Sequence, residues 1–458
     1  MRRSRSLRVV GLAALWSLLA AAPASAHVLD AKVDAPLPFA VYLLGAAAVV
    51  ALSFAFAAMS DGAPVPEPEP GRVRTLWRPF RWLLRLVGLG AWTWVVLQTI
   101  AGGTSDAEVA SLLLWVFGWI GLALVSSLLG PIWAWLDPFS TLYDILAAFI
   151  RPTGLHLAGR APWHQLTQAW PAVVLMALFV WLELVGNVGG GRDLGLALIG
   201  YTLVTLGGMA WYGKERWREH VEVFSVWFGL LGRLAPYGLV GSRDDGRVQR
   251  RGFGSALTSA PWSNSLLAVV AVATGSVIWD GVSQTQTFHD LVGDQHVVIE
   301  TALLGGFLVL LTELVVQVAR RVGLAAMGAG LVPVAVGYLT AHYLTYLLTE
   351  GQRIIVALSD PLQQGWDLFG TIGFEPREDW LAGSLVWTIQ VSAVVIGHVV
   401  GAWLGHSAVR QERAEGKSVS QWPLAALMIG MTMLALWSLG QNLVFVSEVV
   451  PAAVPAAG

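Results

Sequence analysis

The sequence contains no cysteine among its 458 residues, and only 13% of the residues are charged. The absence of cysteine excludes disulfide bonds, thiolate metal sites and cysteine nucleophiles. Any metal ion would therefore need imidazole, carboxylate or amide ligands. The charged fraction is about half of that in ordinary globular proteins, and the basic residues form no extended stripe of the kind that binds nucleic acid. We therefore expect no nucleic-acid partner and no ordinary water-soluble domain.

Apolar residues dominate the sequence instead. They make up 55% of the chain, the mean hydropathy is +0.63, and apolar runs of about 18 residues or more recur along the whole length. Runs of this length are typical of transmembrane helices. The predicted fold class is all-α: a polytopic helical membrane protein with about ten transmembrane helices after a cleaved signal peptide, plus interfacial cytoplasmic helices.

Residues 1–26 have the pattern of a secretory signal peptide. A basic start precedes a short apolar run, which ends in the small residues Ala24, Ser25 and Ala26. We predict that this segment is cleaved, and an uncleaved first span is the alternative. The mature chain, residues 27–458, would then be a single polytopic domain that begins at His27.

Hydropathy predicts ten spans, near residues 37–58, 83–101, 109–130, 169–186, 194–213, 264–280, 297–319, 324–348, 384–406 and 423–446. With the first span starting outside, the loops assigned to the cytoplasm contain most of the arginine and lysine residues. The outer segments contain only Lys32, Arg192, Arg353 and Arg377. Through the positive-inside rule, this asymmetry predicts a multi-pass protein of the cell (plasma) membrane with both mature termini outside.

Two cytoplasmic segments have the pattern of interfacial helices. In residues 220–235, Glu222, Ser225 and Arg233 belong to a thin polar stripe on an otherwise apolar helix. A helix of this kind is expected to lie on the inner leaflet of the bilayer. We make the same prediction for residues 137–150.

The span predicted at 324–348 contains a polar stripe. Its members share one face of a helix, and they are Tyr338, His342, Thr345, Tyr346 and Thr349. Lipid cannot form hydrogen bonds with such groups, so this face must meet protein or a cavity. We therefore predict a functional site on this face, with His342 in the outer third of the membrane.

The span predicted at 384–406 contains two polar residues, Gln390 and His398, beside a ridge of small residues. Gly397, Gly401 and Gly405 recur at every fourth position. This spacing lets two membrane helices approach closely. Ionisable groups inside a membrane are costly, which makes His342 and His398 functional candidates, and interhelical hydrogen bonds are the alternative.

Acidic and histidine residues also collect near the predicted outer face. Glu183 ends the fourth span, Asp280 ends the sixth, and His289 and His296 follow. Histidines with carboxylates can hold a divalent metal ion that lowers the pKa of a bound water. Their spacing matches no fixed metal motif, and a surface position is the alternative for each histidine. The predicted catalytic set is Glu183, His342, Gln390 and His398, and the predicted metal ligands are His27, Asp280, His289, His296 and His342.

Eight stretches of the sequence carry a family resemblance: AHVLDAKVDAPLPFAVYLLGAAAVVALSF, WLELV, WYGKERW, EVFSVWFGLLGRLAP, WDGVSQTQTF, AHYLTYLL, SDPLQQGWDLFGT and IGHVVGAWLGH. Through them, nearly the whole mature chain resembles the fenitrothion-hydrolase-like integral membrane proteins of bacteria. The resemblance implies a polytopic fold and the hydrolysis of a neutral organophosphate triester by water. It transfers no established catalytic residues.

Three functions follow from these patterns. The first is a hydrolase of a small lipophilic ester at the outer face of the membrane, with a divalent metal ion as its expected cofactor. The second is a transporter or channel for a small solute or metal ion, which would need polar residues as far as the inner face; Glu313, Gln317 and His406 are the candidates there. The third is a copper-binding protein, in which the amino group and imidazole of His27 chelate the metal.

Overall fold

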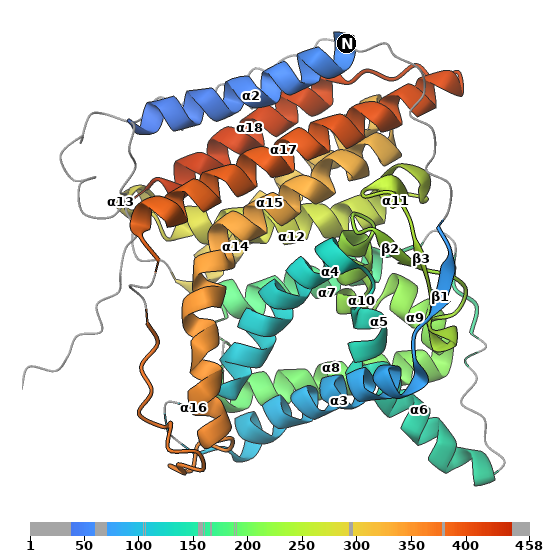
Figure 1. Cartoon of the computed structure of the whole chain (residues 1–458), viewed down its shortest axis with the longest axis vertical. Coiled ribbons are helices and arrows are strands. Elements are labelled where there is room, and N and C mark those ends of the chain that lie inside the picture. Colours follow the sequence, from blue (N-terminus) through green and yellow to red (C-terminus); the bar gives the residue numbers. More distant parts are fainter. Residues whose placement is uncertain are drawn as a thin grey trace, which may run out of the picture.

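The computed structural model describes residues 38–59, 71–103, 105, 107–153, 159, 161–164, 167–186, 188, 190–292, 296–377 and 381–441. Helices make up most of this part of the chain (Figure 1). The predicted signal peptide, residues 1–26, and the proposed copper ligand His27 lie outside the described residues.

Each predicted span corresponds to a helix. The helices are α2 (Phe39–Met59), α3 (Arg78–Ala101), η2 (Ser111–Gly121) continued by α4 (Leu122–Leu129), α7 (Trp170–Leu184), α8 (Gly191–Tyr212), α12 (Asn264–Ser283), α14 (Val297–Val322), α15 (Leu324–Glu350), α17 (Gly383–Ala414) and α18 (Trp422–Leu439). Nine helical segments in the described part of the chain are long and apolar enough to cross a membrane. The exception among the ten is α7, which has 15 residues. The helical membrane fold is therefore confirmed.

Shorter elements connect these helices: α5 (Trp133–Leu136), α6 (Pro138–Ile150), η3 (Arg151–Thr153), α9 (Lys214–His220), α10 (Val223–Gly232), η4 (Arg243–Asp245), α11 (Ser255–Ser259), α13 (Gln286–Val292), η5 (Gly351–Arg353) and α16 (Ile354–Ser359). Three strands that the sequence did not predict, β1 (Val73–Thr75), β2 (Tyr237–Leu239) and β3 (Arg247–Arg250), form an antiparallel sheet in the order β1-β3-β2. Val73 lies opposite Gln249, and Tyr237 lies opposite Arg250.

Contacts between loops divide the loops into two groups, one at each end of the long helices. The sheet joins two loops that the charge pattern assigned to the cytoplasm, and the backbone N–H of Ser420 donates to the carbonyl of Arg321 (3.1 Å) on the same assigned side. Ser105 donates to Asp360 (2.6 Å) between two loops that were assigned to the outside. In Figure 1 the strands and α11 lie at one end of the long helices, and α13 and α16 lie at the opposite end. Each contact thus joins segments that were placed on one side.

The prediction that residues 220–235 form an interfacial helix is wrong. Helix α10 buries eight of its ten residues, among them Phe224, Trp227 and Leu231. It packs against α4, α5, α7 and α9, so no apolar face is left for lipid. Glu222, a member of its polar stripe, forms hydrogen bonds inside the protein. The Glu222 carboxylate caps the helix by accepting the N–H groups of Phe224 and Ser225.

Helix α6, which was also predicted to be interfacial, is buried only at its start. Residues Pro138–Thr141 and Tyr143 are buried, whereas the side chain of Phe149 is 77% exposed. In Figure 1 its far end extends away from the other helices. The contact of this exposed apolar end with the bilayer stays a prediction.

The predicted close approach at the glycine ridge is confirmed, and α15 is the partner helix. A Cβ atom added at Gly397 would lie 2.7 Å from the carbonyl oxygen of Pro333 and 3.0 Å from the Cα atom of Gly337. The two backbones are therefore in direct contact. Helix α15 also packs against α12, which is buried along most of its length. The α12–α15 contact is where the polar residues meet.

Candidate functional site

Asp280, in the last turn of α12, is the centre of a polar network. Its Oδ2 atom accepts a hydrogen bond from His342 Nε2 (3.0 Å) and another from the Tyr343 hydroxyl (2.7 Å), both from α15. Its Oδ1 atom accepts a hydrogen bond from the amide of Gln284, one turn further along its own chain. Donors on both oxygens favour the ionised carboxylate. The network joins α12 to α15 and holds a negative charge inside the protein.

The bond to Asp280 determines the state of the His342 ring. A carboxylate can only accept, so Nε2 of His342 must hold a hydrogen, and Nδ1 of the neutral ring then has a free lone pair. The structure gives Nδ1 no hydrogen-bond partner in the described part of the chain. The side chain of His342 is 15% accessible. An oriented imidazole whose second nitrogen has a free lone pair can act as a general base.

Two hydroxyl groups and this imidazole surround the Cα atom of Gly281. The Tyr338 hydroxyl and Ser438 Oγ are 2.8 Å apart, which links α15 to α18. A Cβ atom added at Gly281 would lie 3.1 Å from the Tyr338 oxygen, 3.2 Å from the Ser438 oxygen and 3.3 Å from His342 Cε1. The absence of a side chain at Gly281 therefore lets the imidazole and the two hydroxyls pack closely over its backbone.

Glu183, near the end of α7, approaches the same network. Its carboxylate interacts electrostatically with Asp280 and with the Tyr343 hydroxyl. Among the residues that the structure describes, it has no hydrogen-bond or ion-pair partner. Of the predicted acidic and histidine residues, the structure therefore joins Asp280 and His342 directly, and Glu183 lies near enough to interact with Asp280 electrostatically.

The other two predicted catalytic residues do not join this network. Gln390 is half-buried on α17, and no hydrogen bond of its side chain is found within the described residues. His398 is 1% exposed, and its Nδ1–H donates to the carbonyl of Val394 on its own helix (2.8 Å). Its Nε2 atom is buried and has no hydrogen-bond partner within the described ranges.

The predicted metal ligands meet only in part. Asp280 and His342 are in contact, but His296 caps α14 by accepting the N–H of Val298 at Nδ1 (3.3 Å), and His289 lies on α13. In the described ranges, no three His, Asp or Glu side chains are placed to share one metal ion. The described residues therefore do not fit a divalent metal site, and His27 as a ligand stays a prediction.

The residues missed from the sequence are Tyr343, Gln284 and Ser438. Tyr343 lies about 100° around the helix from His342, so it was not part of the predicted stripe. Gln284 follows Asp280 by four residues, a spacing that places both on one helix face and was a usable signal. Ser438 is 158 residues from Asp280 in sequence, and only the tertiary structure places it here.

Comparisons of the chain with protein-family models, with curated proteins and with solved structures found no match. The function must therefore be argued from the geometry and from the chemistry of these side chains.

Proposed function

We propose that this protein is a membrane-embedded hydrolase of small lipophilic esters, with organophosphate triesters as the substrate class, and that His342 is its general base. The observation that carries the proposal is the 3.0 Å contact between His342 Nε2 and Asp280 Oδ2. A carboxylate in this position orients the imidazole, selects its tautomer and stabilises the imidazolium that forms when Nδ1 takes a proton.

In the proposed reaction, His342 Nδ1 removes a proton from a water molecule while the water oxygen attacks phosphorus. The new P–O bond forms, the bond to the aryloxide leaving group breaks, and the proton on His342 then passes to the aryloxide or to bulk water. The Ser438 hydroxyl donates to the carbonyl of Ala435 (2.9 Å), so the Tyr338 hydroxyl is the donor in its 2.8 Å contact with Ser438. The Tyr338 hydroxyl would have to turn away from Ser438 to donate to the phosphoryl oxygen as it gains charge. The described side chains are sufficient for this route without a metal ion.

The substrate class follows from the surroundings and from the sequence resemblance. The network lies on α12 and α15, two apolar helices that are long enough to cross a membrane. A neutral triester partitions into the bilayer and needs no charged group for binding. The resemblance to fenitrothion-hydrolase-like proteins supports the same class.

The test compares Asp280→Asn with Tyr343→Phe, because each removes a hydrogen bond from the same network. In Asp280→Asn the imidazole loses its orienting carboxylate, and kcat for a paraoxon-type triester should fall by about 10²–10⁴-fold with KM little changed. In Tyr343→Phe the His342–Asp280 contact remains, and kcat should fall by less than about tenfold. Release of the coloured aryloxide, normalised to folded protein, measures both.

Three results would contradict this proposal. They are an absence of ester hydrolysis by the wild-type protein, equal losses in Asp280→Asn and Tyr343→Phe, and abolition of the activity by a chelator. The last result would show that a metal ion, held with the help of residues outside the described ranges, generates the nucleophile.

A second candidate function is the transport of a proton or a small solute. The observation that favours it is that His398 and His406 lie two turns apart on α17, and each has a buried Nε2 atom that finds no partner in the described part of the chain. They are separated by about 12 Å along the helix, as successive binding groups along a transport pathway would be. If the protein is a transporter, His398→Phe should abolish solute-coupled proton uptake into proteoliposomes while leaving any ester hydrolysis intact.

We also propose the finer features of the topology. The signal peptide is removed, α7 is the fourth of ten spans, and both mature termini face the outside of the cell membrane. The charge asymmetry of the loops and their grouping into two sets support this arrangement.

A further inference from the structure

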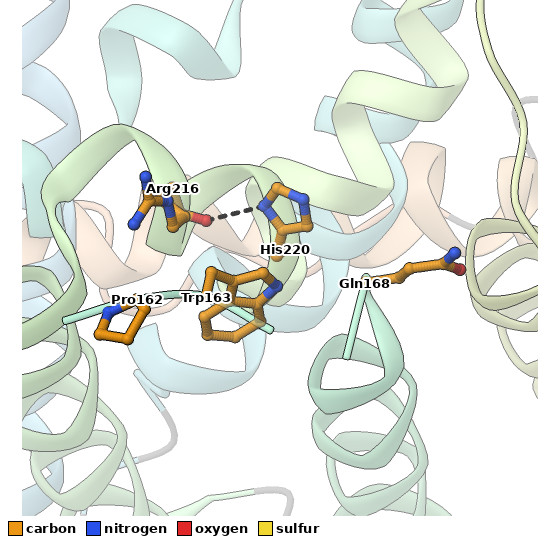
Figure 2. Close-up of a pocket in the computed structure, with 5 residues that line it drawn as sticks. All are labelled: Pro162, Trp163, Gln168, Arg216 and His220. Atoms are coloured by element: carbon orange, nitrogen blue, oxygen red, sulfur yellow. Dashed lines mark hydrogen bonds between the residues drawn. The ribbon is translucent and has the colours of Figure 1, made fainter. Parts of the chain in front are cut away.

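A separate pocket lies where α8 ends and α9 begins. Its volume is about 530 Å³, and it is lined by Pro162, Trp163, Gln168, Arg216 and His220 (Figure 2). In Figure 2 the Trp163 ring lies beneath His220, with the Arg216 side chain on one side and Gln168 on the other. The pocket has no residue in common with the Asp280 network.

The lining of this pocket offers several hydrogen-bond donors and lacks a negative charge. Arg216 uses Nη1 to donate to the carbonyl of Ala161 (3.2 Å), and its other guanidinium N–H groups have no acceptor in the described part of the chain. The Trp163 Nε1–H is buried, and it has no acceptor among the residues that the structure describes. No carboxylate is among the described lining residues. Such a set fits a ligand that only accepts hydrogen bonds and is negatively charged.

Aromatic contacts hold the pocket in place. The Trp163 ring meets Tyr212, the last residue of α8, edge-on with the centroids 5.2 Å apart, and it lies 5.6 Å from the ring of His220. His220 is fixed in turn, because its Nδ1–H donates to the carbonyl of Arg216 (3.0 Å), as the dashed line in Figure 2 shows. The donors are therefore presented by an ordered framework.

The position of the pocket identifies the source of the anion. It lies at the end of α8, a helix long and apolar enough to cross a membrane, and close to Trp170, the first residue of α7. Tryptophan and tyrosine at helix ends are typical of the membrane–water interface. Phospholipid phosphates lie at this level, and basic pockets at helix ends bind anionic headgroups.

We propose that this pocket binds the phosphate group of an anionic phospholipid, with Arg216 as the principal ligand and the Trp163 N–H as a second donor. The guanidinium would form a charge-assisted, two-pronged contact with two phosphate oxygens. This lipid site is independent of the proposed hydrolase activity.

The test is native mass spectrometry of the whole protein released from detergent micelles that contain dilute phosphatidylglycerol. Arg216→Gln should weaken binding of one lipid about tenfold, because it removes a charge-assisted hydrogen bond. Arg216→Lys keeps the charge but not the planar fork, so its affinity should be intermediate. Trp163→Phe keeps the ring, removes the N–H and should weaken binding about threefold. The matched control is Arg247→Gln, an exposed arginine on β3, which should leave lipid binding unchanged.

Equal losses in Arg216→Gln and Arg247→Gln would overturn the proposal, because they would show non-specific attraction to the basic surface. Equal binding of zwitterionic phosphatidylcholine would contradict the charge argument. Displacement of the lipid by millimolar inorganic phosphate would assign the pocket to free phosphate instead. If Arg216→Gln does not elute as a monodisperse protein, Trp163→Phe decides alone.

Discussion

Two buried carboxylates, those of Asp280 and Asp137, accept hydrogen bonds from different kinds of donor. Asp137, which caps α6, forms ion pairs with Arg218 (2.8 Å) and Arg243 (3.0 Å). Asp280 receives its bonds from a histidine, a tyrosine and an amide. The charge of Asp137 is thus balanced by permanent cations, as in a structural ion pair. The charge of Asp280 is balanced only if His342 takes a proton, which is the event that general-base catalysis requires.

The Asp137 cluster makes a prediction about stability. Asp137→Asn leaves the half-exposed Glu215 as the carboxylate partner of Arg218 (3.1 Å) and Arg243 (3.7 Å), so the free energy of unfolding should fall by at most about 3–5 kcal/mol. Asp144→Asn is the matched control, because Asp144 also pairs with two cations, Arg85 and Lys214, but its side chain is 32% exposed. That substitution should cost at most about 1 kcal/mol. Thermal unfolding in detergent measures both variants, and equal losses would contradict the prediction.

Because Asp137 is paired with Arg218 and Arg243, we expect the free energy of unfolding to fall in acid. Burial would raise the pKa of Asp137, but Arg218, Arg243 and Ser140 lower it from its ordinary value of 3.8 to about 2. The folded pKa is below the unfolded one, so the stabilisation is fully present above pH 3.8 and is lost as the pH falls toward about 2. Each pKa unit corresponds to about 1.4 kcal/mol, so the loss should be about 2 kcal/mol. Asp137→Asn should abolish this part of the pH dependence.

At the scale of elements, the packing of α15 against α17 holds the site helix in place. Gly397→Ala would put a methyl group 2.7 Å from the carbonyl oxygen of Pro333. Backbone atoms cannot rotate away, so the helices must separate, at a cost of about 1–3 kcal/mol. Gly306→Ala, on α14, is the control, because a Cβ atom there meets nothing within 4 Å. Thermal unfolding in detergent should show a loss for the first variant alone.

The length of α7 matters at the same scale. Its 15 residues extend for about 22 Å, which is less than the roughly 30 Å thickness of the hydrocarbon core. If α7 is the fourth span, as proposed, the helix by itself is too short to cross the whole core. Glu183, in its last turn, would then approach Asp280 from within the membrane instead of from the surface.

At the scale of the whole molecule, the predicted orientation can be tested with single cysteines, because the natural sequence has none. Glu375 and Ser418 are exposed and lie in loops that were assigned to opposite sides. A membrane-impermeant maleimide should label Glu375→Cys in intact cells, and Ser418→Cys only after the cells are opened, because the reagent cannot cross the bilayer. Labelling of both variants in intact cells, or the reverse order, would contradict the topology.

Hydropathy alone was enough to predict the features that depend on whether a segment meets water or lipid. Apolar runs of sufficient length must lie in a bilayer, so the positions of the ten helices could be read from hydropathy. The glycine spacing from Gly397 to Gly405 predicted a close helix contact. The cost of an ionisable group in lipid also identified His342 and His398 as residues that need partners.

Which side chains contact one another could be seen only from the packing of the helices. The sequence pattern of α10 is the same whether its apolar faces meet lipid or protein, and the surrounding helices determined that it is buried. The pairing of His342 with Asp280, and the position of Ser438 beside them, depend on contacts between helices that are far apart along the chain. Local periodicity shows which face of one helix is polar, but it contains no information about which other helix that face will meet, because that choice depends on the packing of the whole bundle.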